Sequence, residues 1–128
     1  MTQDKELLLK DLCARLPYGV KYECSDIKNI WKLNAIMTKR QDDGVFLDVY
    51  NPLDLCKPYL FPLSSMTEEQ KYEYDELIHL NNIKAIEGVI TNTDCSAAEI
   101  DWCNKNQFDY RGLIPKGLAI DATGLNIY

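Results

Sequence analysis

The side chains that most often carry catalysis are scarce in this chain. Its 128 residues include a single histidine and no motif typical of a nucleotide, phosphate or metal site. A cysteine held beside a histidine can act as a nucleophile activated by a base. The candidates are His79 and the five cysteines Cys13, Cys24, Cys56, Cys95 and Cys103. None stands in a context typical of a thiol enzyme, and cysteines commonly pack as small apolar side chains, so we expect no thiol catalysis.

Carboxylates offer a second chemistry. Asp48, Asp54 and Glu68 could together hold a divalent metal, because hard oxygen ligands need no short sequence motif. Other carboxylates stand as immediate neighbours, such as Asp42 and Asp43, and neighbours of this kind are typical of turns and solvated faces. A metal-dependent hydrolase is therefore the weakest of three functional hypotheses, and we expect no resident metal or cofactor.

Aromatic residues are the better candidates for binding. Tyr59 and Phe61 alternate in a proline-bounded segment, so an extended backbone would place both rings on one side, where they could contact a partner or a planar ligand. The alternative is that this segment crosses a sheet and buries both rings. Tyr110 and Arg111 stand together in a turn and could bind a phosphate or carboxylate, or form a structural salt bridge instead.

Composition limits the partners and the compartment. The formal charge is −6 and the isoelectric point is near 4.7, which argues against direct binding to nucleic acid. The odd number of cysteines, without paired spacing, favours a reducing cytoplasm over an oxidising compartment. The first residues are polar, and no apolar run approaches the roughly 20 residues of a membrane span, so we expect no signal peptide and no membrane anchor.

Hydrophobic periodicity predicts one α+β domain spanning residues 1–128. Leucines spaced for one helical face predict a helix that ends before Pro17 and Gly19. Alternating patterns then predict strands over 20–24, 31–37 and 45–50, which we expect to form a three-stranded antiparallel meander with Trp31 on its buried face. Its most strongly indicated part is the hairpin between Trp31 and Tyr50, with a turn at Asp43 and Gly44.

About three helices are expected around this meander. Thr67 to Gln70 has the spacing of a capping box at a helix start, and Ser96 to Glu99 has the same spacing at a second start. Residues 82–94 suit either a helix or a strand. The glycine-rich tail after residue 112 predicts turns around short apolar anchors.

Three segments resemble a family of small uncharacterised proteins carried by phages, prophages and mobile elements of Bacteroides-type gut anaerobes. They are Leu12–Val20 (LCARLPYGV), Lys57–Glu69 (KPYLFPLSSMTEE) and Phe108–Ile114 (FDYRGLI). The resemblance implies an accessory protein that acts inside a bacterial cell. It transfers no functional residue.

Two functional hypotheses are favoured over the metal-dependent hydrolase. The first is a non-enzymatic protein that binds a host macromolecule as an inhibitor or adaptor, with acidity that favours a basic target. The second is a small-molecule binding protein for a nucleotide-like ligand, with a site between subunits lined by Arg111 and Tyr59. A concave pocket with convergent polar groups would favour the second hypothesis, whereas an exposed apolar patch would favour the first.

Unpaired cysteine spacing gives a prediction about the thiols. We expect all five cysteines to remain reduced, without disulfides and without zinc. Thiol titration of the protein unfolded under non-reducing conditions should count five groups. Stoichiometric zinc, or a count below five, would contradict this.

Overall fold

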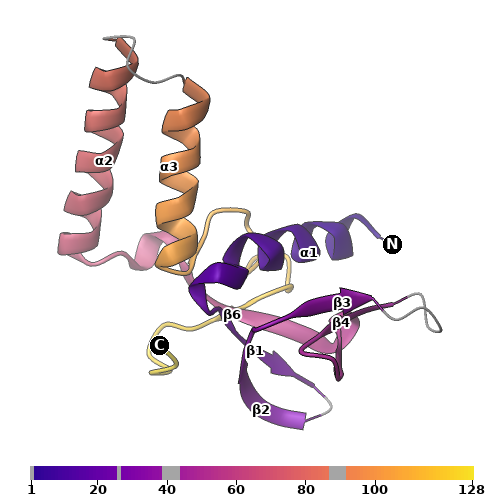
Figure 1. Cartoon of the computed structure of the whole chain (residues 1–128). Helices are drawn as coiled ribbons and strands as arrows, with labels where there is room; N and C mark the ends of the chain where they lie inside the picture. The colour runs from indigo at the N-terminus through magenta and orange to yellow at the C-terminus, as the bar shows by residue number, and fades with distance from the viewer. Residues whose placement is uncertain (1, 26, 39–43, 87–91) are drawn as a thin grey trace.

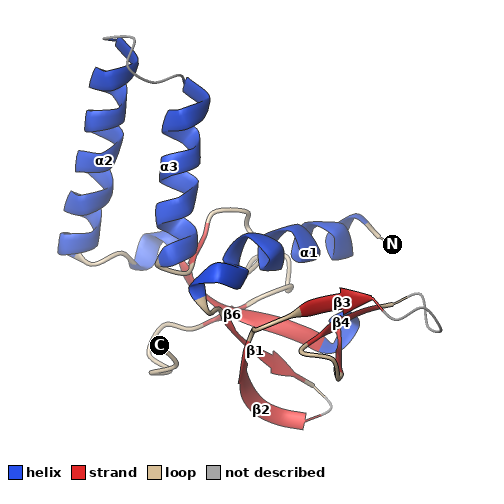
Figure 2. Ribbon diagram, viewed as in Figure 1, coloured by secondary structure: helices blue, strands red, loops and turns tan. Residues whose placement is uncertain are grey.

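The chain folds into a body of two sheets and a helix, from which a helical hairpin projects (Figures 1 and 2). The structure, a computed structural model, describes residues 2–25, 27–38, 44–86 and 92–128. Its helices are α1 (Gln3–Arg15), α2 (Glu68–Ile86) and α3 (Asn92–Lys105). Its strands are β1 (Lys21–Cys24), β2 (Ile27–Lys32), β3 (Ile36–Thr38), β4 (Val45–Leu47), β5 (Asn51–Pro52), β6 (Cys56–Pro62), β7 (Phe108–Asp109) and β8 (Ile120–Asp121). The fold class is α+β, as predicted.

Two sheets make up the body. In the larger one the order is β2-β1-β6-β7, with β8 also paired to β6; β1 is antiparallel to β2 and β6, whereas β7 and β8 are parallel to β6. The smaller sheet is antiparallel in the order β3-β4-β5. A three-stranded antiparallel sheet is therefore present, but the strand over 20–24 lies in the other sheet.

The predicted hairpin between Trp31 and Tyr50 is confirmed only in its inner part, where Ile36 pairs with Leu47. The predicted strand over 31–37 is wrong, because the chain leaves the larger sheet after Lys32 and enters the smaller one at Ile36. Trp31 consequently lies on the edge strand β2, half-buried against the core.

Asp48 makes the hydrogen bonds that turn the chain between the sheets. Its Oδ1 accepts from the backbone N–H groups of Asn34 (2.8 Å) and Ala35 (3.0 Å), and its Oδ2 accepts from the buried Tyr22 hydroxyl (2.7 Å). Asp48 and Val49 both have left-handed backbone, with φ of 51° and 76°. Such a conformation is strained for a β-branched residue, so the bonds of Asp48 hold a turn that Val49 alone would not favour.

Local chemistry explains both ends of α1. The Thr2 side chain accepts a hydrogen bond from the Lys5 N–H at the helix start, and Leu8 and Leu12 bury the apolar face against the core. A short 3₁₀ turn with Pro17 follows, and Gly19 ends it with φ of 66°, a conformation that glycine adopts readily. This part of the sequence was predicted correctly.

The two hairpin helices differ in how well their starts were predicted. The capping box before α2 is confirmed: the Gln70 N–H donates to Thr67 Oγ1 (3.2 Å) and the Thr67 N–H donates to Gln70 Oε1 (2.9 Å). The second predicted start is wrong, because α3 begins at Asn92, four residues before Ser96. The ambiguous segment 82–94 is helical at both ends, and residues 87–91 lie outside the described residues.

A fully buried ion pair ties α1 to the chain after α3. Arg15 Nε donates to Asp11 Oδ2 (2.8 Å), and neither side chain is exposed to solvent. Arg15 Nη2 also donates to the Phe108 carbonyl (2.5 Å), and Arg111 Nε lies 3.2 Å from Asp11 Oδ1. One carboxylate therefore pairs with two guanidinium groups, of which that of Arg15 is fully buried and that of Arg111 is partly exposed.

Removing Asp11 should be severely destabilising. In Asp11→Ala the Arg15 guanidinium stays buried without its counter-charge, and we expect the free energy of unfolding to fall by about 3–5 kcal/mol. Denaturant unfolding measures this. Asp54→Ala is the control, because Asp54 pairs with Lys5 at the surface, and its loss should cost less than about 1 kcal/mol. Equal effects of the two variants would contradict the role of the buried pair.

Candidate functional site

Tyr59 and Phe61 do not form an exposed aromatic pair. Tyr59 is only 8% exposed, and its carbonyl accepts a hydrogen bond from the Tyr128 hydroxyl (2.8 Å). Phe61 is half-buried, and the centroid of its ring lies 6.3 Å from that of Phe108 and 5.7 Å from that of Tyr128. Both residues lie on β6, a strand of the larger sheet, so the alternative that the sequence left open, in which the sheet buries both rings, describes Tyr59 fully and Phe61 only in part.

Tyr110 and Arg111 join the buried ion pair. The Arg111 guanidinium lies 4.9 Å from the centroid of the Tyr110 ring, and its Nη2 donates to the Tyr110 hydroxyl (3.0 Å). Arg15 lies 5.4 Å from the same ring. Arg111 therefore forms a structural ion pair with Asp11. A structural salt bridge was the alternative to ligand binding that the sequence left open. Tyr59 is buried and Arg111 is paired, so a ligand site lined by these two side chains would require both to move.

The carboxylates are dispersed, and of the thiols only Cys24 and Cys56 are cross-strand partners within the described residues. Among the side chains that the structure describes, no group of three or more His, Cys, Asp and Glu residues could hold a metal ion. Asp48 is engaged in the turn between the sheets, and Asp54 pairs with Lys5 (2.6 Å). His79 is exposed on α2. Burial raises the pKa of the Cys103 thiol, which disfavours the nucleophilic thiolate form.

An aromatic cluster fastens the hairpin to the body. The Trp102 ring of α3 stacks on Phe108 with centroids 5.5 Å apart, and the Tyr74 ring of α2 lies 5.0 Å from Trp102. The Trp102 indole N–H donates to Glu73 Oε1 (3.1 Å). Phe61 and Tyr110 pack against the same cluster. Two of the four predicted residues thus support the base of the hairpin.

The hairpin carries all of the protein's net charge. Residues 68–105 contain nine Asp and Glu side chains and three Lys, a net charge of −6, whereas the rest of the chain contains eleven acidic and eleven basic side chains. The body is therefore neutral, and the element that projects from it is strongly acidic (Figure 1). The sequence contained this signal, but it emerges only when charges are counted by structural element rather than over the whole chain.

Exposed apolar side chains accompany the acidic ones on the hairpin. Tyr72 is 69% exposed, Leu80 47% and Ile100 40%. Six of the hairpin's described acidic residues are also exposed: Glu68, Glu69, Glu73, Asp75, Glu76 and Asp101. Tyr72, Glu76 and Leu80 follow one another at helical i, i+4 spacing, so they share one face of α2. This mixture of large apolar groups and negative charge is a candidate interaction surface, here called the acidic hairpin surface.

No family model, curated protein or solved structure matches this chain. The resemblance to phage and mobile-element proteins therefore stays a prediction from the sequence. No helix within the described residues is long and apolar enough to cross a membrane. The function is accordingly inferred from the geometry and charge of the molecule itself.

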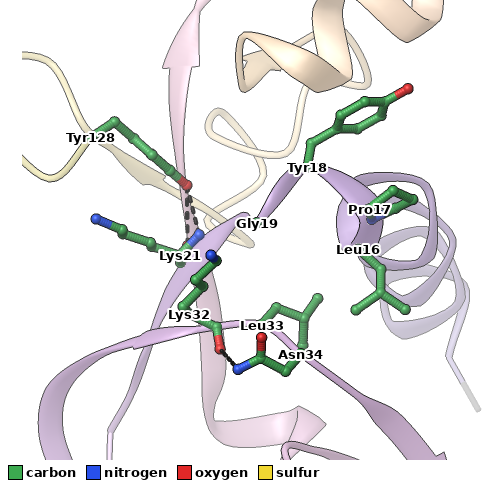
Figure 3. Close-up of a pocket in the computed structure, with 9 residues that line it drawn as sticks. All are labelled: Leu16, Pro17, Tyr18, Gly19, Lys21, Lys32, Leu33, Asn34 and Tyr128. Atoms are coloured by element: carbon green, nitrogen blue, oxygen red, sulfur yellow. Dashed lines mark hydrogen bonds between the residues drawn. The ribbon is translucent and has the colours of Figure 1, made fainter.

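An open pocket lies on the body, and none of the four predicted binding residues lines it. It has a volume of about 730 Å³ and is lined by Leu16, Pro17, Tyr18, Gly19, Lys21, Lys32, Leu33, Asn34 and Tyr128 (Figure 3). Tyr128 is fixed at its edge, because its hydroxyl accepts from the Lys21 N–H (2.8 Å) and donates to the Tyr59 carbonyl. Sequence reasoning missed this pocket, since its walls come from three separate parts of the chain: residues 16–21, residues 32–34 and Tyr128.

The hydroxyl of Tyr128 gives a prediction about alkaline pH. Although 45% of the residue is exposed, its hydroxyl is held against the body by Lys21 and Tyr59, and burial of this group raises its pKa to about 12, compared with an ordinary value near 10. Between these values the folded protein keeps the phenol proton while the unfolded chain releases it, so stability should fall as pH rises through this window. Denaturant unfolding between about pH 9 and 12 measures the slope. In Tyr128→Phe the free energy of unfolding should decline less steeply with pH than in wild type. The control Tyr72→Phe, at an exposed position, should decline as wild type does. Identical slopes for Tyr128→Phe and wild type would contradict the assignment.

Proposed function

We propose that this protein is a non-enzymatic binding protein that uses the acidic hairpin surface to engage a basic protein partner. The observation that carries this proposal is the distribution of charge: a net charge of −6 on the projecting hairpin and a neutral body. In the phage or mobile-element setting that the resemblance implies, the partner would be a host protein that is inhibited or recruited.

The charge distribution favours a directed encounter. Charges of one sign concentrated on a projecting element produce a stronger local field than the same charges spread over the whole surface, and this field accelerates association with an oppositely charged protein. The fold needs few of these carboxylates. Asp75, Glu76 and Asp101 are exposed and lie outside the ion pairs formed among the described residues.

Apolar contacts would supply most of the short-range affinity. Exposed aromatic residues at the centre of a compact interface commonly contribute a large share of the binding energy, and rim charges contribute mainly to specificity and association rate. Tyr72 is the most exposed large apolar side chain among those that the structure describes on the hairpin. It replaces Tyr59 and Phe61 as the proposed anchor, because Tyr59 is buried and Phe61 is half-buried against the aromatic cluster at the base of the hairpin.

Matched charge variants test the proposal. The hairpin variant is Asp75→Asn with Glu76→Gln and Asp101→Asn, and the body variant is Asp4→Asn with Glu6→Gln and Asp54→Asn; each removes three exposed negative charges. Partners are captured from a bacterial lysate and identified by mass spectrometry. We expect wild type and the body variant to retain the same basic protein, and the hairpin variant to retain at least about tenfold less.

A second pair of variants tests the aromatic anchor. Tyr72→Ala should weaken capture of that protein at least about tenfold, whereas Tyr50→Ala, which removes a 75% exposed ring from the body, should leave it unchanged. Capture should also decline as salt rises, because exposed charges are screened within roughly 8 Å at physiological ionic strength. Equal losses in the hairpin and body variants, or a partner without basic character, would refute the proposal.

A further inference from the structure

The open pocket on the body has an electrostatic character opposite to that of the hairpin. Two of its nine lining residues are lysines, Lys21 and Lys32, and none is acidic. In a chain with twenty acidic and fourteen basic side chains, a pocket of this size without a carboxylate is a local concentration of positive charge. The observation is independent of the acidic hairpin surface.

The two lysines stand directly opposite each other on neighbouring strands. Lys21 of β1 is the cross-strand partner of Lys32 of β2. Like charges at directly opposed positions of an antiparallel pair repel each other and destabilise the sheet. An anion bound beside them would remove this repulsion.

One of the two lysine ammonium groups donates a hydrogen bond within the protein, whereas the other remains available to a ligand. Lys21 Nζ donates to the Ile127 carbonyl (2.7 Å) and lies 5.6 Å from the centroid of the Tyr128 ring. Lys32 is exposed and makes no ion pair with any residue that the structure describes. Lys32 is therefore the cation that remains available to a ligand.

The backbone beneath Lys32 is shaped to accept its side chain. A Cβ atom at Gly19 would lie only 2.8 Å from Lys32 Cε, so the absence of a side chain at this position lets the lysine lie close against the turn. The Gln107 side chain holds this turn by donating to the Tyr18 carbonyl (3.1 Å). Figure 3 shows the end of the Lys32 side chain beside Gly19, with Tyr18 and Tyr128 on either side in this view.

Tyrosine rings complete the surroundings of the cation. Tyr18 is 38% exposed and Tyr128 is 45% exposed, so both can present an aromatic surface to a bound molecule. A pocket of about 730 Å³ falls in the range that holds small organic ligands. A cation next to exposed aromatic rings suits a ligand that combines an anionic group with a planar ring.

We infer that this pocket binds a small molecule in which a phosphate or carboxylate group is attached to a planar ring. Lys32 contacts the anionic group, Lys21 and Tyr128 form the adjoining wall, and Tyr18 packs against the ring. This is a different location from the one that the sequence suggested for a nucleotide-like ligand.

Three probes distinguish the chemistries: inorganic phosphate, AMP and benzoate. Each is titrated into ¹⁵N-labelled protein while amide chemical shifts are followed. We expect AMP or benzoate to shift the amides of Gly19, Leu33 and Asn34 in a saturable way, with a dissociation constant of about 1 mM or tighter. Binding of AMP alone assigns a phosphate ligand, and binding of benzoate alone assigns a carboxylate. A tighter affinity for AMP than for inorganic phosphate measures the contribution of the ring.

Matched lysine variants show whether the cation is responsible. Lys32→Ala should weaken binding at least about tenfold, because the charge-assisted contact is lost, while Lys10→Ala, at an exposed position on α1 outside the pocket, should change it less than about twofold. The amide spectra also report whether each variant remains folded. The inference is overturned if neither AMP nor benzoate gives saturable shifts at the pocket, whatever inorganic phosphate does, or if Lys32→Ala binds as wild type does.

Discussion

The buried Arg15 guanidinium is the group on which the arrangement of this molecule depends. A buried charge is tolerated only where a counter-charge and hydrogen-bond acceptors surround it, and Arg15 finds these in Asp11 and in the Phe108 carbonyl. The first acceptor lies in α1 and the second lies just after α3. The requirement to satisfy one cation therefore fixes the N-terminal helix against the segment that follows the hairpin.

The contacts of Arg15 also fix the position of the hairpin on the body. Phe108 accepts from Arg15 through its backbone and stacks on Trp102 through its ring. The ion pair and the aromatic cluster thus meet at a single residue, at the base of the hairpin. The body is electrically neutral, while the projecting hairpin carries a charge that the fold does not require. Such a division separates the residues that maintain the structure from those available to a partner.

The sequence predicted the elements with strong local signals and missed those that depend on distant contacts. The helix over residues 3–15 and the capping box at Thr67 follow from short-range spacing, and both were found. The break between β2 and β3 was missed because it depends on Asp48, which lies 13 and 14 residues from the amides that it binds. For the same reason, Arg111 was a binding candidate until the fold placed Asp11 beside it. The pocket around Lys32 was likewise invisible, since cross-strand register cannot be read from alternation alone.

The turn at Asp48 and Val49 has a consequence for how this fold can change. Val49 adopts a φ of 76°, which a β-branched side chain disfavours and which glycine adopts without steric penalty. Its side chain is 38% exposed, so little core packing depends on its identity. Position 49 is therefore a place where the native sequence is not the most stable one for its own backbone. A lineage of this protein could gain stability there without altering its core, its hairpin or its pocket.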